Sequence, residues 1–111
     1  MTKYVKRPTE NRIIISPDYS KIPPQAIDME EAVLGAIIIE SKVIVKILSI
    51  LKPEFFYKES HQIIFKTLFD MYTKEIPLDL YTITEELRIN HLLELVGGPV
   101  YLTQLSGLEL P

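Results

Sequence analysis

The 111-residue chain contains no cysteine and no tryptophan, and only four of its residues are glycine. The absence of cysteine excludes disulfide bonds and thiolate metal sites. No apolar run approaches the roughly 20 residues that a membrane-spanning helix needs. The first residues do not resemble the apolar core of a secretion signal. We therefore expect a cytoplasmic protein with no membrane partner.

The glycines and histidines also limit the chemistry that the chain can perform. None of the four glycines fits the GxxxxGK[ST] spacing of a phosphate-binding loop. The only two histidines, His61 and His91, do not form a His-Glu-x-x-His zinc motif. We therefore predict no catalytic residue, no cofactor and no metal in this chain. An enzyme built on His61, His91 and nearby acids is the minor alternative, which metal analysis and an ATPase assay would detect.

Charge is divided unevenly along the chain, although the net charge is only −3. Residues 1–24 carry five basic and two acidic side chains, which gives +3, and the remaining seven bases and thirteen acids give −6. An acidic surface repels the phosphate backbone of nucleic acids, so a basic protein is the more natural partner of residues 25–111. Weak contact between residues 1–24 and nucleic acid is the alternative to a solvated tail.

Proline is concentrated near the start, and residues 1–24 hold four of the eight prolines with scattered charge. This composition predicts a flexible, extended N-terminal arm. Its one apolar cluster, Ile13–Ile15, forms a short strand or docks elsewhere. Two adjacent prolines, Pro23 and Pro24, favour extended backbone, so we expect the folded part to begin after them.

From residue 25 onwards, apolar residues recur at the spacing of amphipathic helices. The first helix is expected to begin at Asp28, an N-cap with Glu31 as its capping-box partner, and to end before Ser41. A second capping box, Thr82 with Glu85, should open the fourth helix. The expected helices after the first cover residues 43–51, 58–74, 82–90, 92–96 and 98–105, with Gly97 and Gly98 ending one helix and starting the next.

These patterns predict an all-α fold, a compact bundle of about five or six short helices. The clearest apolar stripe belongs to the helix at 58–74 and consists of His61, Ile64, Phe65, Leu68, Phe69 and Tyr72. We predict His61 to be a packed histidine with one hydrogen-bonded nitrogen. The acids Glu30 and Glu31 are interpreted as first-turn residues that complement the helix dipole.

Four segments resemble, in order and spacing, the N-terminal domain of bacterial replicative DNA helicases of the DnaB family. The family's opening element is similar to Pro23-Pro24-Gln25 with Glu31-Ala32-Val33-Leu34-Gly35. Its second element is similar to Phe56-Tyr57 with His61-Gln62 and Ile64-Phe65. The third element resembles Asp79-Leu80 with Thr82 and Glu86-Leu87. The fourth element resembles Leu92-Leu93-Glu94 with Val96-Gly97-Gly98 and Tyr101-Leu102. Together they cover about residues 22–106.

The resemblance implies a non-catalytic helical domain at residues 25–111 that pairs with copies of itself, as a dimer or a trimer of dimers, in one tier of a hexameric ring. It also implies binding of primase and of a helicase loader. The family's helical hairpin and ATPase domain would follow Pro111, so ATP, magnesium and DNA would be bound by the parent helicase.

Two residues are carried over from the family as candidates for contact with primase. The tyrosine of the last element and the acid of the first correspond to Tyr101 and Asp28 here. Simple packing of Tyr101 and helix capping by Asp28 are the alternatives. A free-standing adaptor of phage or plasmid type, which captures primase or helicase by mimicking this domain, is the alternative function, and the coding sequence after Pro111 would distinguish the two.

Overall fold

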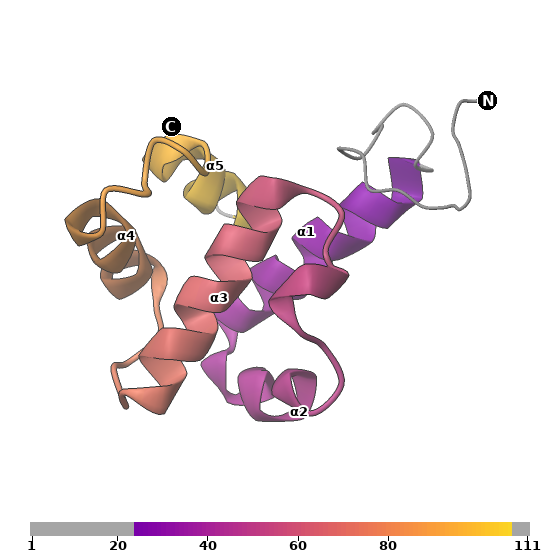
Figure 1. Cartoon of the computed structure of the whole chain (residues 1–111), viewed down its shortest axis with the longest axis horizontal. Helices are drawn as coiled ribbons and strands as arrows, with labels where there is room; N and C mark the ends of the chain where they lie inside the picture. Colours follow the sequence, from indigo (N-terminus) through magenta and orange to yellow (C-terminus); the bar gives the residue numbers. More distant parts are fainter. Residues whose placement is uncertain (1–23, 108–111) are drawn as a thin grey trace, which may run out of the picture.

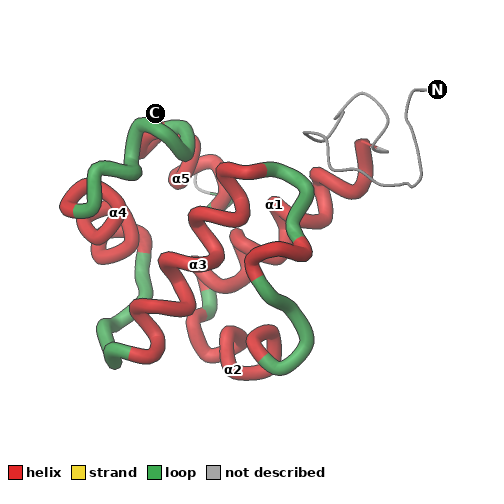
Figure 2. Tube along the Cα trace, viewed as in Figure 1, coloured by secondary structure: helices red, strands yellow, loops and turns green. Residues whose placement is uncertain are grey.

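A computed structural model of the chain describes residues 24–107. Within this range every regular element is a helix, which confirms the all-α prediction (Figures 1 and 2). The elements are α1 (Pro24–Ile39), the 3₁₀ helix η2 (Ser41–Val43), α2 (Ile44–Leu48), the 3₁₀ helix η3 (Pro53–Phe55), α3 (Glu59–Thr73), α4 (Leu80–Ile89) and α5 (Gly98–Leu105). The predicted arm lies outside the described residues except for Pro24, which is already helical.

The central helix is α3, with α1 and α4 on opposite sides of it (Figure 1). The helix α5 contacts both α1 and α4 and so closes the far end of the bundle. The fully or almost fully buried apolar side chains come from all five α-helices and the loops beside them: Leu34, Ile37, Ile38, Ile44, Phe56, Ile64, Phe65, Leu68, Met71, Ile83, Leu87, Val96, Leu102 and Leu105. None of the helices within residues 24–107 is long and apolar enough to cross a membrane.

The first helix begins earlier than the sequence predicted, and Asp28 is not its cap. α1 starts at Pro24, so Asp28 lies inside the helix and is exposed. Proline suits the first helical position because its φ is already near the helical value and it has no N–H to satisfy there. Consequently Glu30 and Glu31 lie in the second turn of α1 rather than the first, and the helix dipole does not account for them.

The start of α4 also differs from the prediction. Asp79 is the N-cap, and its Oδ1 accepts a hydrogen bond of 2.9 Å from the backbone N–H of Thr82. The Thr82 hydroxyl oxygen in turn accepts from the backbone N–H of Asp79 at 3.0 Å. Thr82 is therefore the third residue of the helix, and Glu85 pairs with Arg88 instead. The carboxylate of Asp79, already in extended backbone, is the better acceptor for the cap.

Residues 92–96 form turns instead of the predicted short helix. His91 and Gly97 on either side both have positive φ, 61° and 117°. Positive φ lies outside the right-handed helical region, so neither α4 nor α5 extends into the segment between these two residues. The predicted last helix is confirmed, with Gly97 as the N-cap of α5 and Pro99 in its first turn.

A close approach of α1 to α5 fixes the geometry described below. Gly35 is buried in α1, and a Cβ atom there would overlap the carbonyl oxygen of Leu105. Only glycine lets the two backbones meet at this point. One helical turn before Gly35 is Glu31, and one turn before Leu105 is Tyr101, so the same approach brings these two side chains together.

Candidate functional site

His61, on α3, is fully buried and holds the centre of a chain of hydrogen bonds that joins three helices. Its Nδ1 lies 2.7 Å from Oε1 of Glu30 on α1, and its Nε2 lies 2.5 Å from the hydroxyl of Tyr101 on α5. The Tyr101 hydroxyl donates in turn to Oε2 of Glu31 at 3.0 Å. We call these four residues the histidine network. The prediction that His61 is packed is confirmed, but both of its nitrogens have partners rather than one.

The carboxylate of Glu30 holds the start of α3 against α1. Its Oε2 accepts a 2.6 Å hydrogen bond from the backbone N–H of Tyr57, and its Oε1 is 3.4 Å from the backbone N–H of Lys58, the N-cap of α3. A carboxylate at the N-terminus of a helix also interacts favourably with the positive end of the helix dipole. The negative charge of Glu30 thus interacts favourably with the dipole of α3 and not with that of α1, the helix that carries it.

The ring of Tyr101 has two close neighbours, the imidazole of His61 and the ammonium of Lys58. The planes of the Tyr101 and His61 rings differ by only 7°, and their centroids are 6.0 Å apart. The Lys58 ammonium lies over the Tyr101 ring, 5.2 Å from the centroid of that ring. Burial raises the pKa of Tyr101 far above its ordinary value, and the hydrogen bond to Glu31 and the negative charges of Glu31 and Glu30 raise it further. The phenol therefore keeps its proton.

Glu30, His61 and Tyr101 are hydrogen-bonded in the same order as the acid, histidine and hydroxyl of a catalytic triad, in which the histidine removes the proton of a nucleophile. Two observations argue against such chemistry here. The high pKa of Tyr101 opposes loss of its proton, and His61 exposes none of its surface to a substrate. The network is therefore suited to positioning Tyr101, not to activating it.

Beside the network lies an acidic pocket of about 340 Å³ between α1 and α5. It is lined by Asp28, Glu31, Ala32, Tyr101, Gln104 and Leu105. The two residues that the sequence nominated, Asp28 and Tyr101, therefore line one pocket although they are far apart in the chain. Asp28 is exposed at its edge, whereas Glu31 is tied to Tyr101. Two carboxylates and an amide at one opening suit a cationic group of a partner.

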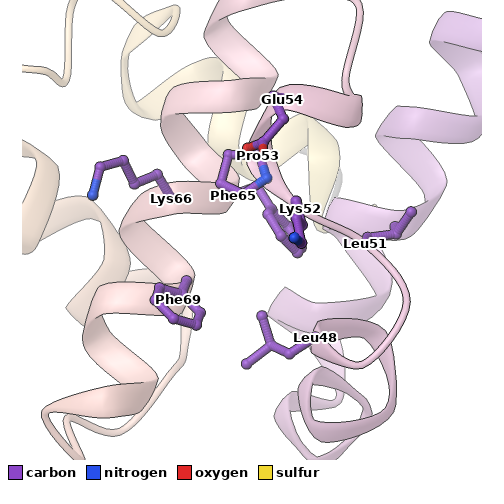
Figure 3. A pocket seen from close by; sticks show the side chains of 8 residues that line it. All are labelled: Leu48, Leu51, Lys52, Pro53, Glu54, Phe65, Lys66 and Phe69. Carbon is purple, nitrogen blue, oxygen red and sulfur yellow. The ribbon is translucent and has the colours of Figure 1, made fainter.

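A second hollow, which we call the apolar groove, lies between α3 and the segment from α2 to η3 (Figure 3). Its volume is about 410 Å³, and it is lined by Leu48, Leu51, Lys52, Pro53, Glu54, Phe65, Lys66 and Phe69. Leu48 and Phe69 lie on opposite sides of it. Phe69 and Tyr72, predicted for the core stripe of α3, are each 41% exposed, because no described element covers that end of the stripe.

Within residues 24–107, no three histidine or acidic side chains form a group that could hold a metal ion. Sequence reasoning missed Glu30 and Glu31 as network residues because their partners are remote in the chain. The available signal was that Glu31, His61 and Tyr101 each belong to a segment that carries the family resemblance.

Comparison with known proteins gives a consistent result. A family model described as the DnaB-like helicase N terminal domain matches residues 22–108. The chain is 44% identical over 86 residues to the replicative DNA helicase DnaB of Rhodothermus marinus. The matched region covers 78% of this chain and 9% of that protein. The chain is 42% identical over 86 residues to the DnaB of Geobacillus stearothermophilus, covering 78% of this chain and 19% of the relative.

Among solved structures, the crystal structure of the N-terminal domain of DnaB helicase from Mycobacterium tuberculosis is similar with a TM-score of 0.72 and 34% sequence identity. The match covers 77% of this chain and 59% of that one. The chain spans less than a fifth of the length of the two helicases above.

Proposed function

This chain belongs to the DnaB-like helicase N-terminal domain family, and on that premise we propose that it is a non-catalytic assembly and docking domain of a replicative DNA helicase. Its two tasks are self-association within the helicase ring and the binding of primase. ATP hydrolysis with magnesium, DNA binding, contact with a helicase loader and a cytoplasmic location belong to the parent helicase in this proposal. A coding sequence that continues into a phosphate-binding loop would support that part, and a stop codon after Pro111 would contradict it.

The acidic pocket is the observation that carries the proposal for primase. It places Asp28 and Tyr101 at one opening, together with Gln104 and the carboxylate of Glu31. The charge of residues 25–111 is −6, so the pocket lies on an acidic domain. A basic side chain of primase that enters this pocket would meet the carboxylates of Asp28 and Glu31, which favour a cation.

Binding of the primase C-terminal domain to Asp28→Lys and Glu40→Lys variants tests this site. Both residues are exposed acids of the α1 region, and the two substitutions change the charge equally. Only Asp28 lines the acidic pocket. We expect Asp28→Lys to weaken binding at least tenfold and Glu40→Lys to have little effect in titration calorimetry. Equal losses in both variants would show only a general charge effect and would contradict this site.

Self-association is proposed to use the apolar groove and the apolar side chains around it. The groove is lined by Leu48, Phe65 and Phe69 among others. Ile50 and Phe55, next in sequence to the groove residues Leu51 and Glu54, are 69% and 55% exposed. An apolar groove and exposed large apolar side chains are typical of contacts between subunits. A second copy of the domain would cover the groove and remove these side chains from water.

Light scattering at rising protein concentration tests whether the apolar groove mediates self-association. The two variants to compare are Phe69→Glu and Leu95→Glu. Leu95 is equally apolar and 65% exposed, but lies in the turns between α4 and α5, away from the groove. We expect wild type and Leu95→Glu to gain mass with concentration, and Phe69→Glu to stay monomeric. A wild-type chain that remains monomeric throughout would contradict self-association by the isolated domain.

A further inference from the structure

The histidine network has three hydrogen-bond contacts, but with ionised glutamates and a neutral histidine it has only two hydrogens to place in them. Its three side-chain contacts are Glu30 with His61, His61 with Tyr101, and Tyr101 with Glu31. Each contact needs one hydrogen between its two atoms. A carboxylate only accepts, a phenol carries one hydrogen, and a neutral imidazole carries one. Two ionised glutamates, neutral His61 and Tyr101 therefore provide two hydrogens for three bonds.

Either arrangement of those two hydrogens leaves one contact without a proton. The hydrogen of His61 must sit on Nδ1, because its neighbour there is the carboxylate of Glu30. Tyr101 can then donate to Nε2 of His61 or to Oε2 of Glu31, but not to both. The contact left over places two lone pairs 2.5 Å or 3.0 Å apart, which is repulsive.

We infer that the network contains a third proton, and that it resides on His61, which is therefore a buried imidazolium ion. With both ring nitrogens protonated, Nδ1–H donates to Glu30, Nε2–H donates to Tyr101, and Tyr101 donates to Glu31. All three contacts are then hydrogen bonds. Of the groups that could carry the extra proton, imidazole is more basic than a carboxylate.

The surroundings of His61 are consistent with a positive charge at this position. From α1 it faces the carboxylate of Glu30, with that of Glu31 one bond further along the network, and from α5 it faces the neutral phenol of Tyr101. From the segment before α3, Phe56 packs edge-on against His61, and the Lys58 ammonium over the Tyr101 ring is the one neighbouring positive charge among these groups. Two negative groups thus accompany one buried cation, as buried charges require.

The proton also controls what Glu31 presents to the acidic pocket. When His61 is charged, Tyr101 is directed towards Glu31 and occupies one of its carboxylate oxygens. When His61 is neutral, the hydroxyl hydrogen turns to Nε2, and Glu31 loses that donor while lining the same pocket. Release of one buried proton therefore leaves a carboxylate without its internal partner at the site that we propose for primase. This last consequence rests on the proposed function, whereas the charge of His61 does not.

Nitrogen-15 spectra of the histidine rings at about pH 7, where an imidazole in water is mostly neutral, test the proposal. The two nitrogens of an imidazolium ion give a pair of similar shifts, whereas a neutral ring gives one protonated and one unprotonated nitrogen. His91 is exposed and serves as an internal reference in the same sample. We expect His61 to give the imidazolium pair and to differ from His91. A neutral pattern for His61 would overturn the proposal.

A matched pair of variants gives a second test. In Glu31→Gln the amide can donate to the Tyr101 oxygen, so Tyr101 can donate to Nε2, and the network is complete with neutral His61. Asp28→Asn makes the same change of charge on the same helix and in the same pocket, but outside the network. We expect Glu31→Gln to convert His61 to the neutral pattern and Asp28→Asn to keep the imidazolium pair.

Identical His61 spectra in Glu31→Gln and Asp28→Asn would also overturn the proposal. The spectra need no primase, so their outcome is independent of the proposed function. If Glu31→Gln fails to fold, the wild-type comparison of His61 with His91 still decides the question.

Discussion

Oε1 of Glu30 lies 2.7 Å from Nδ1 of His61, across 31 positions of the chain. This contact joins the second turn of α1 to the first turn of α3. Because Glu30 also accepts the backbone N–H groups of Tyr57 and Lys58, one carboxylate orients the histidine and holds the start of the helix that carries it.

We expect Glu30→Ala to lower the free energy of unfolding by about 3 kcal/mol, since it leaves the buried imidazole and the N–H of Tyr57 without acceptors. Urea denaturation measures this change. Glu40→Ala is the control, because Glu40 is exposed and its loss should cost less than about 0.5 kcal/mol. Similar losses in the two variants would contradict the role given to Glu30.

The raised pKa of Tyr101 predicts that the free energy of unfolding falls as the pH rises in the alkaline range. Its pKa is raised in the folded state, first by burial and then by Glu31 and Glu30. Folding therefore favours the protonated phenol, and this contribution is complete below the unfolded value of about 10. It is lost as the pH rises from there towards the higher pKa of the folded state, because only the unfolded chain ionises in that range.

Chemical denaturation of wild type and Tyr101→Phe between about pH 9 and pH 11 measures this effect, with the unfolded tyrosine value of about 10 inside the range. The wild type should lose stability more steeply than the variant as the pH rises. Tyr81→Phe, at a tyrosine that is 73% exposed, should retain the wild-type slope. Parallel curves for wild type and Tyr101→Phe would argue against a raised pKa.

Gly35→Ala tests the close approach of α1 and α5. Inside a helix, alanine is ordinarily more favourable than glycine by about 1 kcal/mol. Here the added Cβ would overlap the Leu105 carbonyl oxygen. We therefore expect a loss of about 1–3 kcal/mol through overpacking, measured by thermal or urea unfolding. A variant more stable than wild type would mean that α5 can move away freely.

Asp79→Ala and Glu85→Ala together test where α4 begins. Asp79 provides the observed cap, and its loss should cost about 1 kcal/mol. Glu85 forms an exposed pair with Arg88, so its loss should cost only a few tenths of a kcal/mol. The opposite ranking in urea denaturation would restore the capping box that the sequence predicted at Thr82.

Much of the fold could be predicted because it depends on local periodicity. The spacing of Ile64, Phe65 and Leu68 predicted the helix at 58–74, and the structure has α3 at Glu59–Thr73. Helix starts were less predictable, since several residues compete to be the cap. Asp28 and Thr82 both have suitable side chains, but α1 already begins at Pro24, and Asp79 caps α4 before Thr82.

The site was only partly predictable, for a different reason. Asp28 and Tyr101 were nominated by resemblance, and the structure places both on the acidic pocket. Their role in binding primase stays a prediction. The partners of His61 could not be inferred from spacing, because Glu30 and Tyr101 lie 31 and 40 positions away. Such contacts depend on how the helices pack.

The hydrogen bond from Tyr101 to Glu31 spans 70 positions, nearly the whole described range. Closing so long a loop is slow compared with forming the helices themselves. During synthesis, α1 and α3 can leave the ribosome well before α5, and until then His61 has only one of its two side-chain partners. Because Leu102 and Leu105 are also core residues, the core of the domain can be completed only after translation has passed α5.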